Sequence, residues 1–225
     1  MNIFENNSLH TLSDRFAYSM TVFFRFIADT FFAKRYGHRA VVLETIAGVP
    51  GMVAGMWMHF KSLRSMKVGY GKHIREMLAE AENERMHLMF FIEIAKPNIF
   101  ERSLVLFSQF LFGAFYFFMY VFFTKTAHRM IGFFEDEAVK SYSEYLKMIE
   151  NGEIENVKAP KIAIDYWNLP LNSTLKDVIK VVRDDEAGHR DVNHQFADLI
   201  NIKKSKKNIV TKDKIKEEKT EEILN

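Results

Sequence analysis

The stretches AENERMHLM, residues 81–89, and RDDEAGHRDVNH, residues 183–194, each contain one Glu-x-x-His. The two pairs are Glu84/His87 and Glu186/His189. Residues three apart lie on one face of a helix about one turn from each other, so each pair can present a carboxylate and an imidazole to one metal ion. A lone glutamate precedes each pair along the chain, Glu44 before the first and Glu135 before the second. Di-iron carboxylate bundles use this ligand set, with a lone Glu from each of two helices and Glu-x-x-His from each of two others. The sequence therefore predicts an all-α, ferritin-like four-helix bundle with two iron ions.

Helix faces select these glutamates among their neighbours. Glu135 shares its predicted face with apolar residues such as Ile131, Val139 and Leu146, whereas Asp136 shares its face with Arg129, Lys140 and Lys147 and belongs in water. Glu80 lies about 10 Å along the helix axis from His87, too far to share one ion with it. Four carboxylates on four buried faces would each cost several kcal/mol without a partner, so together they call for a cation.

Composition restricts the type of metal and the type of partner. The chain has 225 residues, of which 48% are hydrophobic and 22 are Phe, enough for one substantial core. It has no cysteine, so a metal must be held by oxygen and nitrogen ligands, and carboxylates with imidazoles favour iron or manganese. A net charge of +2, without a phosphate-binding loop or an aromatic-basic RNA motif, gives no indication of nucleic-acid binding.

Six long helices are predicted. Apolar periodicity and stop signals such as Lys96-Pro97 place them at about residues 13–34, 39–63, 72–95, 104–123, 125–149 and 173–200. Small residues around Glu44, including Gly48, Gly51 and Gly55, predict that another helix approaches the second one closely. Residues 153–171 are expected to form a connection.

The segment LVLFSQFLFGAFYFFMYVFF, residues 104–123, is long and apolar enough for a transmembrane helix. A crossing there would separate Glu84/His87 from Glu135 by the hydrocarbon thickness of about 30 Å, and the charged flanking helices could not cross with it. We therefore expect this helix and the Phe-rich first helix to lie sideways in one membrane leaflet, as two additional hydrophobic helices beside the bundle.

The two ends of the chain are expected to lie outside the bundle. The first ten residues, MNIFENNSLH, do not have the pattern of a typical signal peptide. Residues 203–225 mix charges of both signs with few apolar residues, which predicts a disordered tail after a folded domain of residues 1–202.

Four stretches of the chain resemble a known family. LETIAGVPGMVAGM (residues 43–56), AENERMHLM, FEDEAV (residues 134–139) and RDDEAGHRDVNH resemble the four signature stretches of the alternative oxidase family, over roughly residues 13–200. The resemblance implies a monotopic membrane enzyme, expected to be a homodimer, that oxidises ubiquinol and reduces dioxygen to water without pumping protons. Its expected location is the mitochondrial inner membrane on the matrix side, or the bacterial inner membrane on the cytoplasmic side.

The resemblance also implies roles for individual residues. The same six iron ligands follow from it: Glu44, Glu84, His87, Glu135, Glu186 and His189. Tyr142 matches a family tyrosine proposed as a one-electron donor during O–O cleavage. The quinol pocket would comprise Arg25, Asp29, Arg39, Leu43, Glu137, Ala138 and Ser141. Asn83, Asp185, Tyr166 and Trp167 match positions that steady the ligands.

Other functions use a similar ligand set. A plastoquinol oxidase is chemically almost identical, and a di-iron hydroxylase of quinone precursors or a ferritin-like ferroxidase could use the same six residues. A metal-free helical membrane scaffold is the non-enzymatic alternative, although it would leave four core glutamates without a role.

Overall fold

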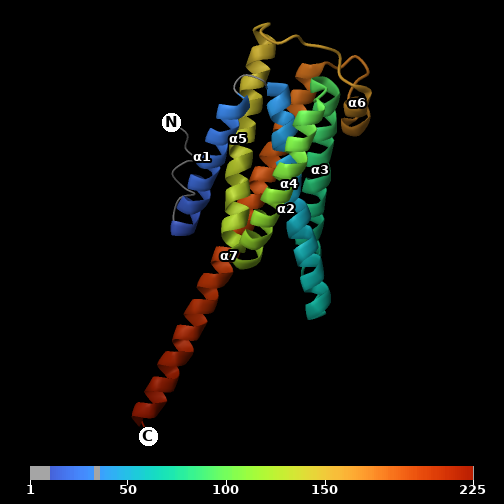
Figure 1. Ribbon diagram of the computed structural model, residues 1–225. Helices are drawn as coiled ribbons and strands as arrows, with labels where there is room; N and C mark the ends of the chain where they lie inside the picture. The colour runs from blue at the N-terminus through green and yellow to red at the C-terminus, as the bar shows by residue number, and fades with distance from the viewer. Residues whose placement is uncertain (1–10, 33–35, 225) are drawn as a thin grey trace.

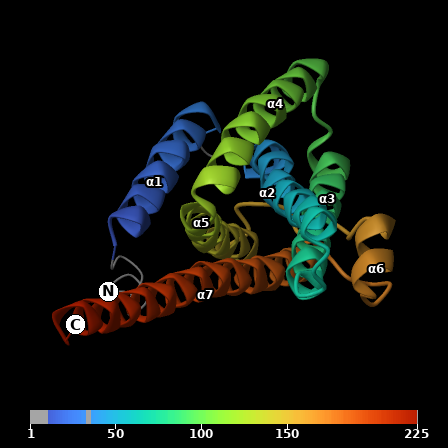
Figure 2. The ribbon, with the colours of Figure 1, turned by 90° about the horizontal axis from the view of Figure 1, so that it is seen from below.

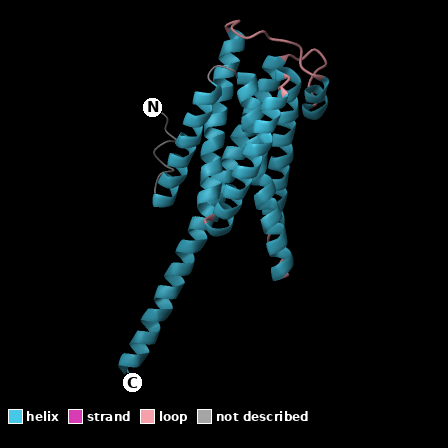
Figure 3. Cartoon of the chain, in the orientation of Figure 1, coloured by secondary structure: helices cyan, strands magenta, loops and turns pink. Residues whose placement is uncertain are grey.

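The computed structural model describes the backbone of residues 11–32 and 36–224, and the side chains of residues 11–30, 40–100 and 102–202. Within these residues, helices form the whole structure apart from loops and one isolated β-bridge between Lys158 and Thr174 (Figure 3). The helices are α1 (Leu12–Phe32), α2 (Tyr36–Ser65), α3 (Gly71–Ala95), α4 (Ile99–Phe122), α5 (Thr124–Glu150), α6 (Lys161–Trp167) and α7 (Leu175–Leu224). The predicted all-α class is confirmed.

Four of the six long helices form a bundle, and the other two, α1 and α4, lie outside it. The closest packing joins α2 to α3 and α5 to α7, while α4 packs against α2 and α5, and α1 against α5. Figure 2 shows α1 and α4 on one side of α5 and α2, with α7 on the other side of α5. The helices expected to carry metal ligands are therefore the four bundle helices, and the two Phe-rich helices share one face.

Glycine allows α2 and α3 to approach closely, as the sequence predicts. A Cβ atom on Gly51 would lie 2.5 Å from the Met77 carbonyl oxygen and 2.9 Å from the Ala81 nitrogen, so only glycine fits there. One turn earlier, a Cβ atom on Gly48 would lie 3.6 Å from the Cβ atom of Glu84. This close approach brings the turn of α2 that carries Glu44 next to Glu84.

Two predicted features differ from the structure. The connection between α5 and α7 contains the short helix α6, whose Ala163 and Ile164 pack into the core beside α3. A segment of seven residues is too short for apolar periodicity to predict a helix. In addition, α7 continues to Leu224 and leaves the bundle, where the sequence predicts disorder beyond residue 202 (Figure 1). Lys- and Glu-rich sequence has a high helix propensity even where it packs against nothing. The domain boundary at residue 202 stays a prediction.

A capping box forms the start of α7. The Asp177 carboxylate accepts hydrogen bonds from the Thr174 backbone N–H and from the Thr174 hydroxyl, each at 2.9 Å. These bonds lower the pKa of Asp177, and the carboxylate lies in the first turn, where a negative charge is favourable.

The outer face of α1 and α4 is apolar. Phe26, Phe107 and Phe110 are each more than half exposed, at 68%, 61% and 74%. Two segments, Ala40–Ser65 and Arg102–Phe122, are long and apolar enough to cross a membrane by length and composition alone. The first lies in α2 and packs along α3 in the bundle, whereas the second lies in α4, at the surface.

Candidate metal centre and adjoining cavity

The structure brings together the six side chains that the sequence singles out. Glu44 comes from α2, Glu84 and His87 from α3, Glu135 from α5, and Glu186 and His189 from α7. Each glutamate is at most 4% exposed and His87 is fully buried, while the His189 side chain is 13% exposed. Ligand atoms of Glu44, Glu84, His87 and Glu186 all lie within 4.8 Å of one another, close enough to hold a metal ion.

Glu84 and Glu186 each lie between the two histidines. Glu84 places Oε2 3.4 Å from His87 Nδ1 and Oε1 2.7 Å from His189 Nδ1. Glu186 places Oε1 3.3 Å from His87 Nδ1 and Oε2 3.6 Å from His189 Nδ1. Glu44 lies on the His87 side, with Oε2 3.3 Å from Nδ1, and Glu135 contacts Glu186. This arrangement places two carboxylates between two imidazoles, with Glu44 beside His87 and Glu135 beside Glu186.

The polar atoms of this cluster face one another without hydrogen bonds. Buried atoms without a hydrogen-bond partner include both oxygens of Glu84, one oxygen each of Glu44 and Glu186, and Nδ1 of both histidines. The distance of 2.7 Å between Glu84 Oε1 and His189 Nδ1 is short, yet the two atoms do not have hydrogen-bond geometry. Buried polar groups are normally satisfied, so a set of acceptors pointing at a common centre fits a bound cation. The donor set, carboxylates with imidazoles and no thiolate, suits iron.

The electrostatics of the cluster also call for positive charge. Burial raises the pKa of Glu44 and of Glu135 well above its ordinary value, and the charges of Glu186 and Glu84 raise it further. Burial acts on Glu84 in the same direction, but His87 and His189 outweigh it and the pKa of Glu84 is lowered. Two of the carboxyls therefore resist ionisation until a cation joins them.

The residues expected to steady the ligands surround the outer nitrogen of His87. His87 Nε2 donates to Asp185 Oδ2 at 3.3 Å, which leaves Nδ1 as the nitrogen that faces the carboxylates. The same Asp185 oxygen accepts bonds from Trp167 Nε1 at 2.8 Å and Asn83 Nδ2 at 3.0 Å. Asn83 Nδ2 also lies 3.3 Å from the Tyr166 hydroxyl. Burial would raise the pKa of Asp185, but these hydrogen bonds outweigh it and lower the pKa, so a carboxylate orients the imidazole.

Tyr142 lies beside the cluster, where the sequence places it. Its hydroxyl donates to Glu44 Oε1, and its ring stacks on Phe91 with centroids 5.8 Å apart. Burial and the nearby charge of Glu44 raise the pKa of Tyr142 well above its ordinary value, so the phenol keeps its proton.

An apolar cavity of about 280 Å³ ends at the cluster. Its inner end is lined by Glu44, Glu135 and Glu186, and its outer end by the partly exposed Ile27 of α1 and Leu104 of α4. Of the predicted pocket residues, five line it: Arg25, Leu43, Glu137, Ala138 and Ser141. Asp29 is half-exposed and pairs with Arg25 at 3.4 Å, without lining the cavity. The side chain of Arg39 lies outside the described residues.

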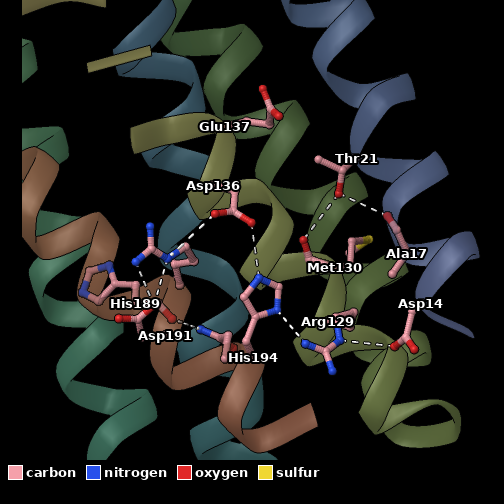
Figure 4. A network of polar contacts seen from close by, with 12 residues as sticks. Asp14, Ala17, Thr21, Arg129, Met130, Asp136, Glu137, His189, Asp191 and His194 are labelled. Atoms are coloured by element: carbon pink, nitrogen blue, oxygen red, sulfur yellow. Dashed lines mark hydrogen bonds and ion pairs between the residues drawn. The ribbon is translucent and has the colours of Figure 1, made fainter. Parts of the chain in front are cut away.

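Polar contacts fix α1 over this cavity. Buried Arg129 of α5 donates to Asp14 of α1 at 3.2 Å and to His194 of α7 at 2.9 Å, and His194 reaches Asp136 (Figure 4). Lys125 pairs with Asp14 as well, at 3.1 Å. Three turns along α1, Arg25 contacts Glu137 at the edge of the cavity. Polar contacts at both ends of α1 thus hold its cavity-lining face against α5.

Sequence reasoning missed a second buried polar group behind the cluster. Asn193 Nδ2 donates to Glu80 Oε2 at 2.8 Å, and Asn193 Oδ1 faces His128 Nδ1 at 2.9 Å. Burial raises the pKa of Glu80 to about 8. The signal was present, because Glu80 is one turn from Glu84 and Asn193 one turn from His189, on the same buried faces.

Replacing His128 by Asn is expected to make folding less sensitive to acid. Burial lowers the pKa of His128 from an ordinary 6.5 to about 3, while the contact with Asn193 opposes the shift and His73 adds to it. Between about pH 6.5 and pH 3 the unfolded chain binds a proton at His128 and the folded protein does not. The free energy of unfolding therefore decreases as the pH is lowered through this range. Each pH unit costs about 1.36 kcal/mol. Denaturant titrations from about pH 6.5 to about pH 5 should show a smaller loss in the free energy of unfolding for His128→Asn than for the original protein. An equal dependence on pH in both proteins would show that His128 does not cause the acid sensitivity.

Fold and cluster together define a class: helical bundles that enclose a buried group of carboxylates and imidazoles able to hold metal. The sequence profile described as "Alternative oxidase" matches residues 3–198. The chain is 55% identical over 189 residues to "Ubiquinol oxidase 1c, mitochondrial" of Arabidopsis thaliana, covering 84% of this chain and 57% of the relative. It is 52% identical over 207 residues to "Ubiquinol oxidase, mitochondrial" of Batrachochytrium dendrobatidis, covering 92% of this chain and 65% of the relative.

The chain belongs to the alternative oxidase family. A third relative, "Ubiquinol oxidase 2, mitochondrial" of Nicotiana tabacum, is 55% identical over 84% of this chain and 63% of its own length. The chain thus spans about three fifths of the length of these curated relatives, and the family resemblance expected from the four motifs is confirmed.

Proposed function

We propose that this protein oxidises ubiquinol and reduces dioxygen to water at a di-iron centre held by Glu44, Glu84, His87, Glu135, Glu186 and His189. The observation that carries the proposal is the apolar cavity that runs from the α1 and α4 face to three of these glutamates. A lipid-soluble two-electron donor needs such a path from an apolar surface to a redox site. The names of the relatives, ubiquinol oxidases, support ubiquinol as that donor.

The positions of the carboxylates suggest how two metal ions would be held. Glu84 and Glu186 each face both histidines and could contribute ligand atoms to both ions, whereas Glu44 lies by His87 and Glu135 by Glu186. Iron bound there would supply the one-electron chemistry by which electrons from quinol reach dioxygen. Two quinols supply the four electrons and four protons that convert one dioxygen into two waters. Because these protons are consumed in the same reaction, the proposed chemistry requires no proton pumping.

The cavity residues would bind and orient the quinol. Ser141 and Arg25 provide polar groups in a lining that is otherwise mostly apolar, as expected for a ring with two hydroxyl groups. Glu137 pairs with Arg25 and with Lys140 at 2.8 Å, so its charge is balanced at the edge of the cavity. We assign Asp29 and Arg39 to the mouth of the pocket on the family resemblance. Tyr142 would supply an electron; its hydrogen bond to Glu44 supports this role, because a phenol that is oxidised releases its proton and Glu44 could accept it.

Substituting Ala138 by Phe is expected to raise the quinol KM more than 10-fold, or to abolish turnover, because a benzyl group would fill part of a small cavity. Iron content should not change, since Ala138 is not one of the six ligands. Glu144→Phe on the exposed side of α5 is the matched control. A variant Ala138→Phe with unaltered quinol kinetics would show that quinol binds elsewhere.

The test of the proposed function uses the full chain purified in detergent. Iron is counted per chain, and oxygen uptake is followed with ubiquinol in the presence of cyanide, with product analysis. We expect two irons, cyanide-resistant uptake and water with unmodified quinone. Absence of iron would favour a metal-free scaffold. A hydroxylated quinone as product would indicate a hydroxylase, and a preference for plastoquinol would indicate the plastid type of oxidase.

We propose that the exposed face of α1 and α4 lies in one leaflet of the membrane, on the matrix side of the mitochondrial inner membrane or the cytoplasmic side of a bacterial one, and that the enzyme is a homodimer. The chain has no cysteine, so single cysteines placed at Arg102, near the start of α4, and at Thr124, just after its end, report topology without background. In sealed vesicles both positions should react with a membrane-impermeant thiol reagent from the same side. Labelling from opposite sides would mean that α4 spans the bilayer.

A further inference from the structure

Asn193 joins three helices directly behind the candidate metal centre. It is 1% exposed and lies on α7, one turn after His189. Its amide nitrogen donates to Glu80 Oε2 of α3 at 2.8 Å and to the His189 carbonyl oxygen at 3.0 Å. Its amide oxygen lies 2.9 Å from Nδ1 of His128 on α5.

The directions of these hydrogen bonds are fixed by chemistry. The backbone carbonyl of His189 can only accept, so the Asn193 atom beside it must be the nitrogen. The amide oxygen therefore faces His128, whose Nδ1 must carry the proton that it donates. Both amide protons of Asn193 and one lone pair of its oxygen are in use, so no other side chain of this size makes the same three bonds.

The two histidines of the centre are oriented in different ways. His87 is held through its ring, because Nε2 donates to Asp185. Among the hydrogen bonds of the described side chains, none holds the ring of His189 through its outer nitrogen. Instead, the backbone carbonyl of His189 accepts a hydrogen bond from Asn193, and Asn193 in turn bonds Glu80 and His128. Its position thus depends on how firmly this turn of α7 is tied to α3 and α5.

We propose that Asn193 is a positioning residue for His189: by linking its turn of α7 to Glu80 on α3 and His128 on α5, it sets the distance of His189 from Glu84 and Glu186. The inference rests on the proposed metal centre. It makes a specific prediction for exchange of the two polar partners. Asn193→Asp removes both donors and sets a carboxylate against the Glu80 oxygen, whereas Glu80→Gln supplies a donor. The double variant therefore restores the α7 to α3 link and keeps one carboxyl and one amide in the pair.

The experiment measures binding of Fe²⁺ alone to metal-free full-length protein without oxygen, by titration with spectroscopic detection. Asn193→Asp should weaken the affinity of the metal ion next to His189 by about 10-fold to 100-fold, and the double variant with Glu80→Gln should recover most of this loss. Glu80→Gln alone keeps an acceptor for Asn193 and should bind almost normally. If Asn193→Asp does not fold, Asn193→Leu, which adds no charge, takes its place as the weakened variant.

Val182→Ala, a core change on the same helix, controls for a general loss of stability. It should lower Tm without changing Fe²⁺ affinity. Equal affinity losses in Val182→Ala and Asn193→Asp, or no recovery in the double variant, would overturn the inference. Failure of the unaltered protein to bind two Fe²⁺ would instead refute the metal centre itself, so the two failures can be told apart.

Discussion

Glu84→Gln is expected to remove both metal ions and to lower quinol-dependent oxygen uptake more than about 100-fold. Glu84 is the fully buried carboxylate that faces Nδ1 of both histidines, at 3.4 Å and 2.7 Å, so both metal positions depend on it. A neutral amide of the same shape offers one weak acceptor in place of two anionic oxygens, and it leaves the charge of the two ions less balanced. Glu44→Gln, on the His87 side, should weaken mainly one of the two ions.

Glu82→Gln is the matched control for this prediction. Glu82 lies two residues earlier on α3, is half-exposed and pairs with Arg85 at 2.7 Å. The control should retain iron and activity, and circular dichroism should show the same helix content in both variants. Oxygen uptake at the original rate in Glu84→Gln, with cyanide present, would mean that the chemistry occurs elsewhere in the protein.

The candidate metal cluster could be predicted from the sequence because helical periodicity places each of its glutamates on a buried face. The faces of Glu44, Glu84, Glu135 and Glu186 are apolar stripes, and a carboxylate on such a stripe is buried whichever helices pack around it. Which of the pocket residues line the cavity could not be predicted in the same way. Asp29 follows Arg25 by one turn, yet only Arg25 reaches the cavity, because the rotation of α1 is set by contacts between Asp14 and α5.

The junction at Asn193 illustrates the same limit. Each of Glu80, His128 and Asn193 lies on a buried face, so their burial could be predicted. Whether they reach one another depends on the axial register of α3, α5 and α7. That register depends on close contacts between helices. At Gly132, for example, a Cβ atom would lie 2.5 Å from the His194 ring. Single-helix patterns fix the rotation of a residue around its own axis and leave the axial register to side-chain packing.

Glu135→Gln is expected to change stability in opposite directions with and without iron. In the metal-free protein, burial and the charges of Glu186 and Glu84 raise the pKa of Glu135 well above 4.5, so the folded state holds a proton that the unfolded chain releases. Stability then falls as the pH rises above 4.5, and an uncharged amide, which can donate to Glu186, removes this cost. The gain near neutral pH should be about 1 to 3 kcal/mol, the order of the desolvation penalty of a buried polar group.

With iron present the sign should reverse, because a ligand that binds only the folded state stabilises it in proportion to its affinity. The original protein should gain Tm on adding Fe²⁺ without oxygen, and Glu135→Gln should gain far less, ending below it. Asp136→Asn is the control, since Asp136 lies next in sequence but pairs with Arg190 and His194 away from the cluster. If Glu135→Gln were less stable both with and without Fe²⁺, Glu135 would be a structural residue, because only a metal ligand makes the carboxylate costly in one state and necessary in the other.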